Sequence, residues 1–212
     1  MSVTSHRRER EKAQRRKDIL QAAREVFLNG RLFQGTIDDV AARAEVSKGT
    51  VYLYFESKET ILALLLLEGL ESLLERFKIA YEPCAALPAG QCLERLASAY
   101  LRFCRECPAH FRLMVAFDRG QFRERVSAAL YGQVFDSSKR LLQFVADVIQ
   151  HGIDSREFQP LDAWHTTGML WAALNGVLLL ADHPLRRELV QVPVEALFEQ
   201  TVAVLLSGIR ET

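Results

Sequence analysis

A short stretch around residue 50 holds the side chains with the clearest chemistry. Val51 and Phe55 recur at a helical spacing of four, so they are expected to anchor a helix to a core. Lys48, Thr50, Tyr52 and Tyr54 would then be left to face outward. An exposed helical surface with hydroxyl and ammonium groups can bind phosphates and the edges of bases. The stretch therefore predicts recognition of double-stranded DNA.

A second short helix is expected immediately before this stretch, over residues 36–43. Thr36 is suited to cap its start, and acidic residues fill its first turn, where they favour the positive end of the helix. Ser47 is suited to cap the following helix, expected over residues 47–53. Two short helices that meet at a tight turn form a helix-turn-helix, whose second helix enters the major groove of DNA.

This region resembles the DNA-binding domain of the tetracycline-repressor (TetR) family of bacterial regulators. The matching motifs are I19-L20-x-A22-A23-x-x-x-F27, D38-x-V40-A41-x-x-A44-x-V46-S47-K48-G49-T50-V51-Y52 and Y54-F55-x-S57-K58-E59-x-I61. They cover about the first quarter to third of the chain, in one register. The resemblance implies that these residues contact operator DNA, mostly through phosphates: Thr36, Ser47, Lys48, Thr50, Tyr52, Tyr54 and Lys58.

Composition indicates an ordinary globular protein, with 212 residues, 49% apolar and 25% charged, and a formal net charge of zero. Residues 1–60 nevertheless carry 12 Lys and Arg against 9 Asp and Glu, and most of the excess lies in residues 1–18. This basic arm is expected either to follow DNA phosphates or to be a solvated terminus that aids solubility. The absence of a secretory signal and of a spanning segment, together with only four cysteines, predicts a cytoplasmic protein.

Apolar residues recur at intervals of three and four, which predicts an all-α fold. Helices are expected over residues 12–29, 36–43, 47–53, 58–80, 91–106, 109–117, 120–153, 161–181 and 193–207, with a break at Pro83 to Gly90. About nine helices in this order are also what the family resemblance implies. The expected domains are a DNA-binding domain with its basic arm at residues 1–57 and a larger effector-binding and dimerisation domain at residues 58–212.

The last two helices carry the pattern of an interface. Gly168, Ala172 and Gly176 lie four residues apart and form a stripe of small side chains, which allows a second helix to approach closely. The final helix has a broad apolar face. The expected dimer contacts there are Leu197, Phe198, Thr201 and Leu205. Two such helices from each of two chains would form a four-helix interface, although both stripes could instead face the core of their own chain.

A pocket for a small effector is expected in the larger domain, because ligand sites are mostly apolar with a few polar groups. Its expected lining combines aromatic, sulfur and amide side chains, although each could equally belong to the core. These residues are Phe103, Phe111, Met114, Val115, Phe144, Trp171 and Asn175. No cofactor is expected.

The sequence Cys104-x-x-Cys107-Pro108-x-His110 is the strongest candidate for metal or redox chemistry. A structural zinc site needs four ligands, and no second pair of closely spaced cysteines exists. Core packing is therefore the favoured interpretation, and no metal is expected. Neither a phosphate-binding glycine loop nor a nucleophile elbow occurs, so the chain is not expected to be an enzyme.

These features together predict a homodimeric transcriptional regulator. We expect a repressor that leaves a palindromic operator when its larger domain binds a small lipophilic or aromatic effector. The alternative is a DNA-anchored factor that uses the same helix-turn-helix and binds a protein partner without a small effector.

Overall fold

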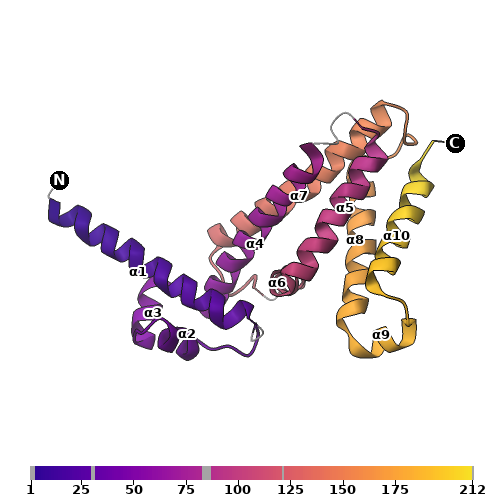
Figure 1. The fold of residues 1–212 in the computed structure, drawn as a ribbon. Coiled ribbons are helices and arrows are strands. Elements are labelled where there is room, and N and C mark those ends of the chain that lie inside the picture. Colours follow the sequence, from indigo (N-terminus) through magenta and orange to yellow (C-terminus); the bar gives the residue numbers. More distant parts are fainter. Residues whose placement is uncertain (1–2, 30–31, 83–86, 121, 212) are drawn as a thin grey trace. The chain divides into compact units, whose positions relative to one another are not determined.

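Ten helices and no strand make up the described residues of the chain in this computed structural model (Figure 1). The structure describes residues 3–29, 32–82, 87–120 and 122–211. The helices are α1 (Val3–Leu28), α2 (Ile37–Arg43), α3 (Lys48–Tyr54), α4 (Lys58–Tyr81), α5 (Ala89–Glu106), α6 (Pro108–Asp118), α7 (Ala128–Asp154), α8 (Ala163–Asp182), α9 (Pro184–Val190) and α10 (Val194–Ile209). The expected all-α fold is confirmed. Pro83 lies in residues 83–86, outside the described part.

These helices form two compact units. The first comprises Met1–Gly69 and Cys107–Phe135, and the second comprises Leu70–Glu106 and Asp136–Thr212. The first unit therefore contains α1 to α3, the start of α4, all of α6 and the start of α7. Helices α4 and α7 each continue from one unit into the other.

Local hydrogen bonds begin the short helices where the sequence predicts. The Thr36 hydroxyl accepts from Asp39 N at 3.2 Å, and the Asp39 carboxylate accepts from Thr36 N at 2.9 Å, which forms a capping box for α2. The Ser47 hydroxyl accepts from Thr50 N at 3.1 Å and caps α3. Glu45 lies between the two helices with a φ of 53°, a left-handed conformation that makes the sharp turn.

The core of the first unit is built from one face of α1 and the helices that pack on it. Ile19, Ala23 and Phe27 of α1 are all completely buried, and so are Val40 of α2 and Val51 of α3. Helix α1 packs on α2, which packs on α3. This apolar face fixes the helix-turn-helix as a rigid element and leaves the opposite side of α3 in solvent.

In the second unit α8 packs on α10, and α5 packs on α10 in turn (Figure 1). A turn after α7 is tied into this arrangement. The Glu157 carboxylate accepts hydrogen bonds from the backbone N–H groups of Ala89 and Gly90 and thereby caps α5. The Phe158 ring is buried against Gly152, where a Cβ would lie only 2.2 Å from its Cδ2.

Two expected helix starts are wrong, and one helix lies where a connection was expected. Helix α1 begins at Val3, not at residue 12, since Arg, Lys, Glu and Gln favour helix and pairs such as Arg7–Glu11 link successive turns. Helix α7 begins at Ala128, not at residue 120, because Gly120 has a φ of 74° and ends α6. Helix α9 occupies the expected connection before residue 193, with Pro184 at its first position.

Within the described residues no single helix is both long and apolar enough to cross a membrane. Helices α9 and α10 reach that length and apolarity only as a pair bent by 67°.

Candidate nucleic-acid interface

Helix α3 is anchored on one side and exposed on the other. Val51 is fully buried and Phe55 is 2% exposed, so these two side chains hold the helix against the first unit. Lys48 and Tyr52 are exposed, as expected. Leu53 is 80% exposed, because a position two residues from both Val51 and Phe55 lies on the opposite side of the helix. An exposed leucine on such a helix can contact the methyl group of thymine.

The other predicted DNA-contacting residues differ in their exposure and in their hydrogen bonds within the protein. Ser47 is exposed, and its hydroxyl lies 2.9 Å from that of half-buried Thr50. Tyr54 is half-buried, and the Thr36 hydroxyl binds the Asp39 carboxylate at 2.8 Å. The polar surface around α3 is therefore assembled by the same hydrogen bonds that cap α2 and α3.

The two predicted lysines have different surroundings. Lys48 Nζ donates to Asp38 Oδ2 at 2.8 Å on the surface, and this hydrogen bond raises the pKa of Lys48. Lys58 Nζ instead donates to the carbonyls of Phe33 at 3.0 Å and Gly35 at 2.6 Å. Lys58 therefore holds the connection between α1 and α2 against the start of α4. The partner of Lys48 is a solvent-exposed carboxylate, which a DNA phosphate could replace.

Helices α1, α4 and α6 meet within the first unit at a junction of charged groups. Arg24 Nη2 and Nε donate to the two Glu68 oxygens at 2.6 and 2.7 Å. The next residue, Gly69, lies against the imidazole of His110, because a Cβ at this glycine would be 2.4 Å from His110 Cδ2. The junction joins the first helix of the DNA-binding region to α6 through one turn of α4.

The protonation of His110 should affect stability at this junction. Burial lowers the pKa of His110 below its ordinary 6.5, and the Glu68 carboxylate opposes this effect only in part. The folded state therefore binds fewer protons than the unfolded state between the two pKa values. The free energy of unfolding is expected to be fully retained above pH 6.5 and to fall as the pH drops toward the lowered pKa. Urea unfolding at a series of pH values should show this slope, and His110→Gln should remove it.

The segment after α6 contacts the first turn of α4. Arg125 Nη1 donates to Glu59 Oε1 at 2.8 Å, and the Ser57 hydroxyl lies 3.2 Å from the Arg125 carbonyl oxygen. Ser57 also accepts from Thr60 N at 3.0 Å and caps α4. The start of α6, through His110, and the segment that follows α6, through Arg125, thus each contact α4 inside the first unit.

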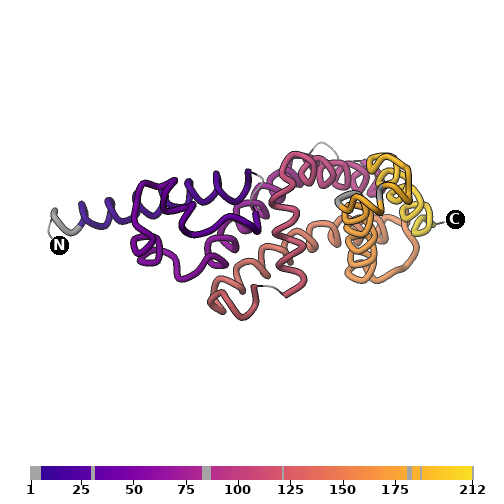
Figure 2. Tube along the Cα trace, turned by 90° about the horizontal axis from the view of Figure 1, so that it is seen from below, coloured from indigo at the N-terminus to yellow at the C-terminus, as the bar shows by residue number. Residues whose placement is uncertain are grey.

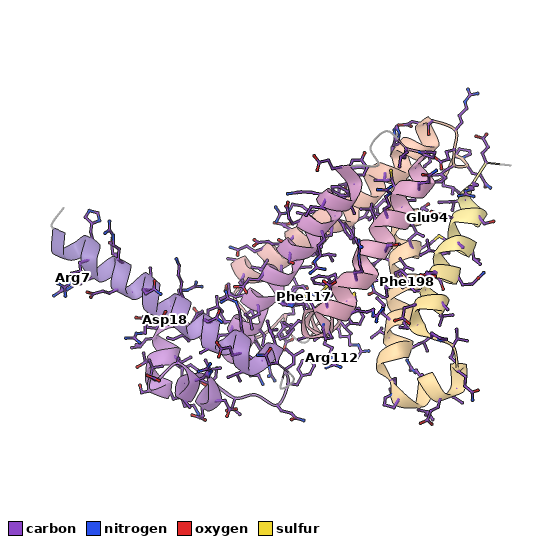
Figure 3. The ribbon with its side chains drawn as sticks, viewed as in Figure 1. Arg7, Asp18, Glu94, Arg112, Phe117 and Phe198 are labelled. Carbon is purple, nitrogen blue, oxygen red and sulfur yellow. The ribbon has the colours of Figure 1, made fainter. Side chains whose placement is uncertain are left out.

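The outer faces of α8 and α10 carry most of the predicted dimer residues. Gly168 and Ala172 are exposed and Gly176 is half-buried, with open space where the Cβ atoms of both glycines would lie. Leu197, Thr201 and Leu205 are half-buried on α10. Phe198 differs from them. It is 1% exposed and packs within its own unit (Figure 3).

Several apolar side chains beside this stripe are more exposed than the sequence suggested. Trp164 is 43% exposed and Trp171 is 38% exposed on α8, and Val204 is 60% exposed on α10. Trp164, Gly168, Trp171 and Ala172 recur at four, seven and eight residues, so they share one helical face. An exposed apolar face of this kind marks an interaction surface.

The predicted pocket residues are divided between the two units. Phe111, Met114 and Val115 belong to α6 in the first unit, and the other four belong to the second. Asn175 of α8 accepts a hydrogen bond from the Tyr100 hydroxyl of α5 at 2.7 Å. Phe103 is fully buried, and the Phe144 ring packs edge-on against Tyr81 at 5.3 Å between centroids.

An open groove of about 480 Å³ lies elsewhere, along α7 and the start of α8. Its lining residues are Lys139, Gln143, Ala146, Asp147, Gln150, Asp162, Ala163 and Trp164. None of the predicted pocket residues is among them.

Of the cysteines, Cys92 and Cys104 are buried and Cys107 is half-buried, and Cys84 lies outside the described residues. Across the described ranges, no three His, Cys, Asp or Glu side chains are grouped so that they could hold a metal ion.

A rigid helix-turn-helix that presents Lys48, Tyr52 and Leu53 to solvent defines a DNA-binding protein. Two family models extend this conclusion to most of the chain. Residues 19–65 match bacterial regulatory proteins of the tetR family, and residues 93–205 match the tetracyclin repressor-like C-terminal domain. The chain belongs to the TetR family of transcriptional regulators, and it is a DNA-binding regulator rather than an enzyme.

Individual relatives agree with this assignment. An uncharacterized HTH-type transcriptional regulator of Bacillus subtilis, YfiR, is 29% identical over 77% of this chain and 78% of its own. The HTH-type transcriptional repressor KstR2 of Mycobacterium tuberculosis is 26% identical over 69% of this chain and 70% of its own. The fold also resembles FadR of Bacillus subtilis, solved with stearoyl-CoA, at a TM-score of 0.66 and 22% identity over 92% and 99% of the two chains.

Proposed function

We propose that this protein is a homodimeric transcriptional repressor of the cytoplasm, which leaves a palindromic operator when it binds a small lipophilic or aromatic effector. The observation that carries the proposal is the exposed face of α3. Val51 and Phe55 fix the helix, so that Lys48, Tyr52 and Leu53 are presented together at a surface. One such helix from each protomer enters a major groove.

A two-fold dimer is part of this proposal, because a palindromic operator requires two recognition helices related by the same symmetry. The exposed apolar faces of α8 and α10 support it. The residues proposed to contact the partner are Trp164, Gly168, Ala172, Gly176, Leu197, Thr201, Val204 and Leu205.

The effector class rests on similarity and on the amount of apolar surface in the larger domain. One fold relative was solved with stearoyl-CoA, and KstR2 of Mycobacterium tuberculosis is described as a ketosteroid transcriptional regulator. Stearoyl-CoA has a long apolar acyl chain, and a ketosteroid is a mostly apolar ring system. The aromatic residues Phe103, Phe144 and Trp171, with the polar Asn175, suit such a ligand.

Signal transmission is assigned to α4 and α6. Helix α4 begins beside the recognition helix at Ser57 and continues into the second unit. The Gly69–His110 contact and the Arg125–Glu59 ion pair tie α6 and its following segment to α4. An effector that favours a different position of α6 would therefore shift α4 and the recognition helix with it.

A coupling experiment tests the repressor proposal. A duplex is first selected from random DNA with the purified protein, and its affinity is measured by fluorescence anisotropy with stearoyl-CoA or a ketosteroid present. An effector of the proposed class should weaken DNA binding about five- to 150-fold, and DNA should weaken effector binding by the same factor. If no lipophilic compound binds while the DNA is still selected, the DNA-anchored factor with a protein partner is favoured instead.

The two lysines should respond differently to replacement by alanine. Lys48→Ala is expected to lower the slope of log affinity against log salt by about one per protomer, without a change in thermal stability. Lys58→Ala should instead destabilise the protein by about 1–2 kcal/mol, because the carbonyls of Phe33 and Gly35 lose a charged donor. Salt titrations and thermal melts of both variants measure the difference. A lowered melting temperature for Lys48→Ala would contradict a role of Lys48 in DNA binding alone. An unchanged melting temperature for Lys58→Ala would contradict a structural role of Lys58.

A further inference from the structure

The N-terminal half of α1 projects from the first unit as a basic helix. Helix α1 has 26 residues, and its apolar contacts begin only at Ile19. Every side chain from His6 to Asp18 is exposed. Figure 2 shows these turns continuing beyond α2 and α3. Nothing in the packing of the first unit requires them.

The charges on this helix are not evenly spread around it. Arg8, Lys12, Arg15 and Arg16 are separated by four, seven and eight residues, so they share one face. We name these four residues the basic stripe. Ile19 and Ala23 continue the same row and are completely buried. The basic stripe is therefore the exposed extension of the face by which α1 packs on the helix-turn-helix.

One contact fixes the direction of this face relative to α3. The Arg16 guanidinium lies over the Phe55 ring, 5.0 Å from its centroid, and Phe55 is the C-cap of α3. The basic stripe thus runs outward from the end of the recognition helix. The three carboxylates of the same segment have partners outside the stripe: Glu9 lies 3.9 Å from His6 Nδ1, and Glu11 accepts from Arg7 and Asp18 from Gln14, each at 2.8 Å.

From these observations we propose that the basic stripe is a second DNA-binding surface, which binds backbone phosphates of the duplex flanking the bases under α3. The inference rests on the proposed DNA-binding function and extends its contact area. From Arg8 to Arg16 the helix is about 12 Å long, at roughly 1.5 Å per residue. That length corresponds to about three to four base pairs, since each strand carries one phosphate per roughly 3.4 Å of axis. The row presents four cations, and the neighbouring Glu9 and Glu11 are paired with His6 and Arg7, so its charge matches a phosphate backbone.

The test compares two triple variants with the same change in net charge. Arg8→Gln, Lys12→Gln and Arg15→Gln remove three of the four charges of the stripe and leave Arg16, which contacts Phe55. Arg7→Gln, Arg10→Gln and Lys17→Gln remove three cations outside the stripe and serve as the matched control. All six positions are exposed, so both variants should fold, which circular dichroism and thermal melting check. The probe is a duplex selected from random DNA with the unmodified protein. It is prepared in two lengths: a flanked duplex with about ten extra base pairs on each side, and a shortened duplex that contains only the selected bases.

On the flanked duplex the stripe variant should bind about tenfold or more weakly, with a salt slope lower by up to about three per protomer. The control variant should change affinity less than about twofold, and on the shortened duplex the two variants should bind alike. Equal weakening by both variants would show undirected charge attraction and overturn the inference, as would no weakening by either. Failure of the unmodified protein to select any duplex would overturn the proposed function itself, which separates the two failures.

Discussion

Replacing Ala172 by arginine should convert the protein from a dimer into a monomer that no longer holds its operator. Ala172 is exposed between Gly168 and Gly176, and open space surrounds the Cβ positions of both glycines. In the proposed dimer a partner helix fills this space, so that a large charged side chain would be buried without a partner. Specific binding by two half-sites is about a thousandfold or more tighter than non-specific binding, and most of that difference should be lost.

Sedimentation velocity and anisotropy with the selected duplex would measure the two effects together. Ala203→Arg is the matched control, because it introduces the same charge on an exposed face of α10 away from Leu197, Thr201 and Leu205. It should leave both the dimer and the DNA affinity unchanged. A monomer in the unmodified protein at micromolar concentration would contradict the proposed interface.

Replacing Gly69 by alanine is expected to destabilise the protein by about 1–3 kcal/mol. This is opposite to the usual effect, because alanine in the middle of a helix is ordinarily about 1 kcal/mol more stable than glycine. The added Cβ would lie 2.4 Å from His110 Cδ2 and 3.0 Å from His110 Cβ. Contact with the base of the imidazole side chain prevents a simple rotation from relieving the overlap.

Gly132→Ala in α7 is the control for this prediction, since nothing lies within 4 Å of the Cβ position there. That variant should be as stable as the unmodified protein or more so. Adding His110→Ala to Gly69→Ala should recover part of the lost stability. In urea unfolding, the double variant should therefore lose less free energy of unfolding than the sum of the losses in the two single variants. If Gly69→Ala alone raises stability as Gly132→Ala does, helices α4 and α6 do not meet as described.

The helix-turn-helix could be predicted in detail because its determinants are local. Thr36, Ser47 and Ser57 each cap a helix through a bond to the backbone three residues later, a relation visible in the sequence itself. Val51 and Phe55 were likewise identifiable from their spacing of four residues. Leu53 lies two residues from each of these anchors and therefore faces away from them, and its 80% exposure was missed because an apolar residue is ordinarily assigned to the core.

Contacts between distant segments could not be predicted in the same way. The carbonyl partners of Lys58 lie more than twenty residues earlier, and His110 meets Gly69 only because α4 and α6 cross at those turns. The apolar residues of α10 are also divided between the core of their own chain and the exposed surface, and the sequence alone does not show which residues go where. Phe198 faces its own core, whereas Val204 is 60% exposed. Which side of a hydrophobic helix meets its own chain depends on the neighbouring helices.

Footprinting on a selected duplex shows whether α3 of a two-fold dimer recognises DNA. The unmodified protein is used to select binding sequences from random DNA, and the enriched duplex is probed by hydroxyl-radical cleavage and by methylation of guanine in the major groove. We expect an inverted repeat, with two protected major-groove sites about 34–36 Å apart along the axis. Lys48→Ala together with Tyr52→Ala should abolish that protection. No enriched sequence, or protection that is unchanged in the double variant, would contradict recognition of DNA by α3 of a two-fold dimer.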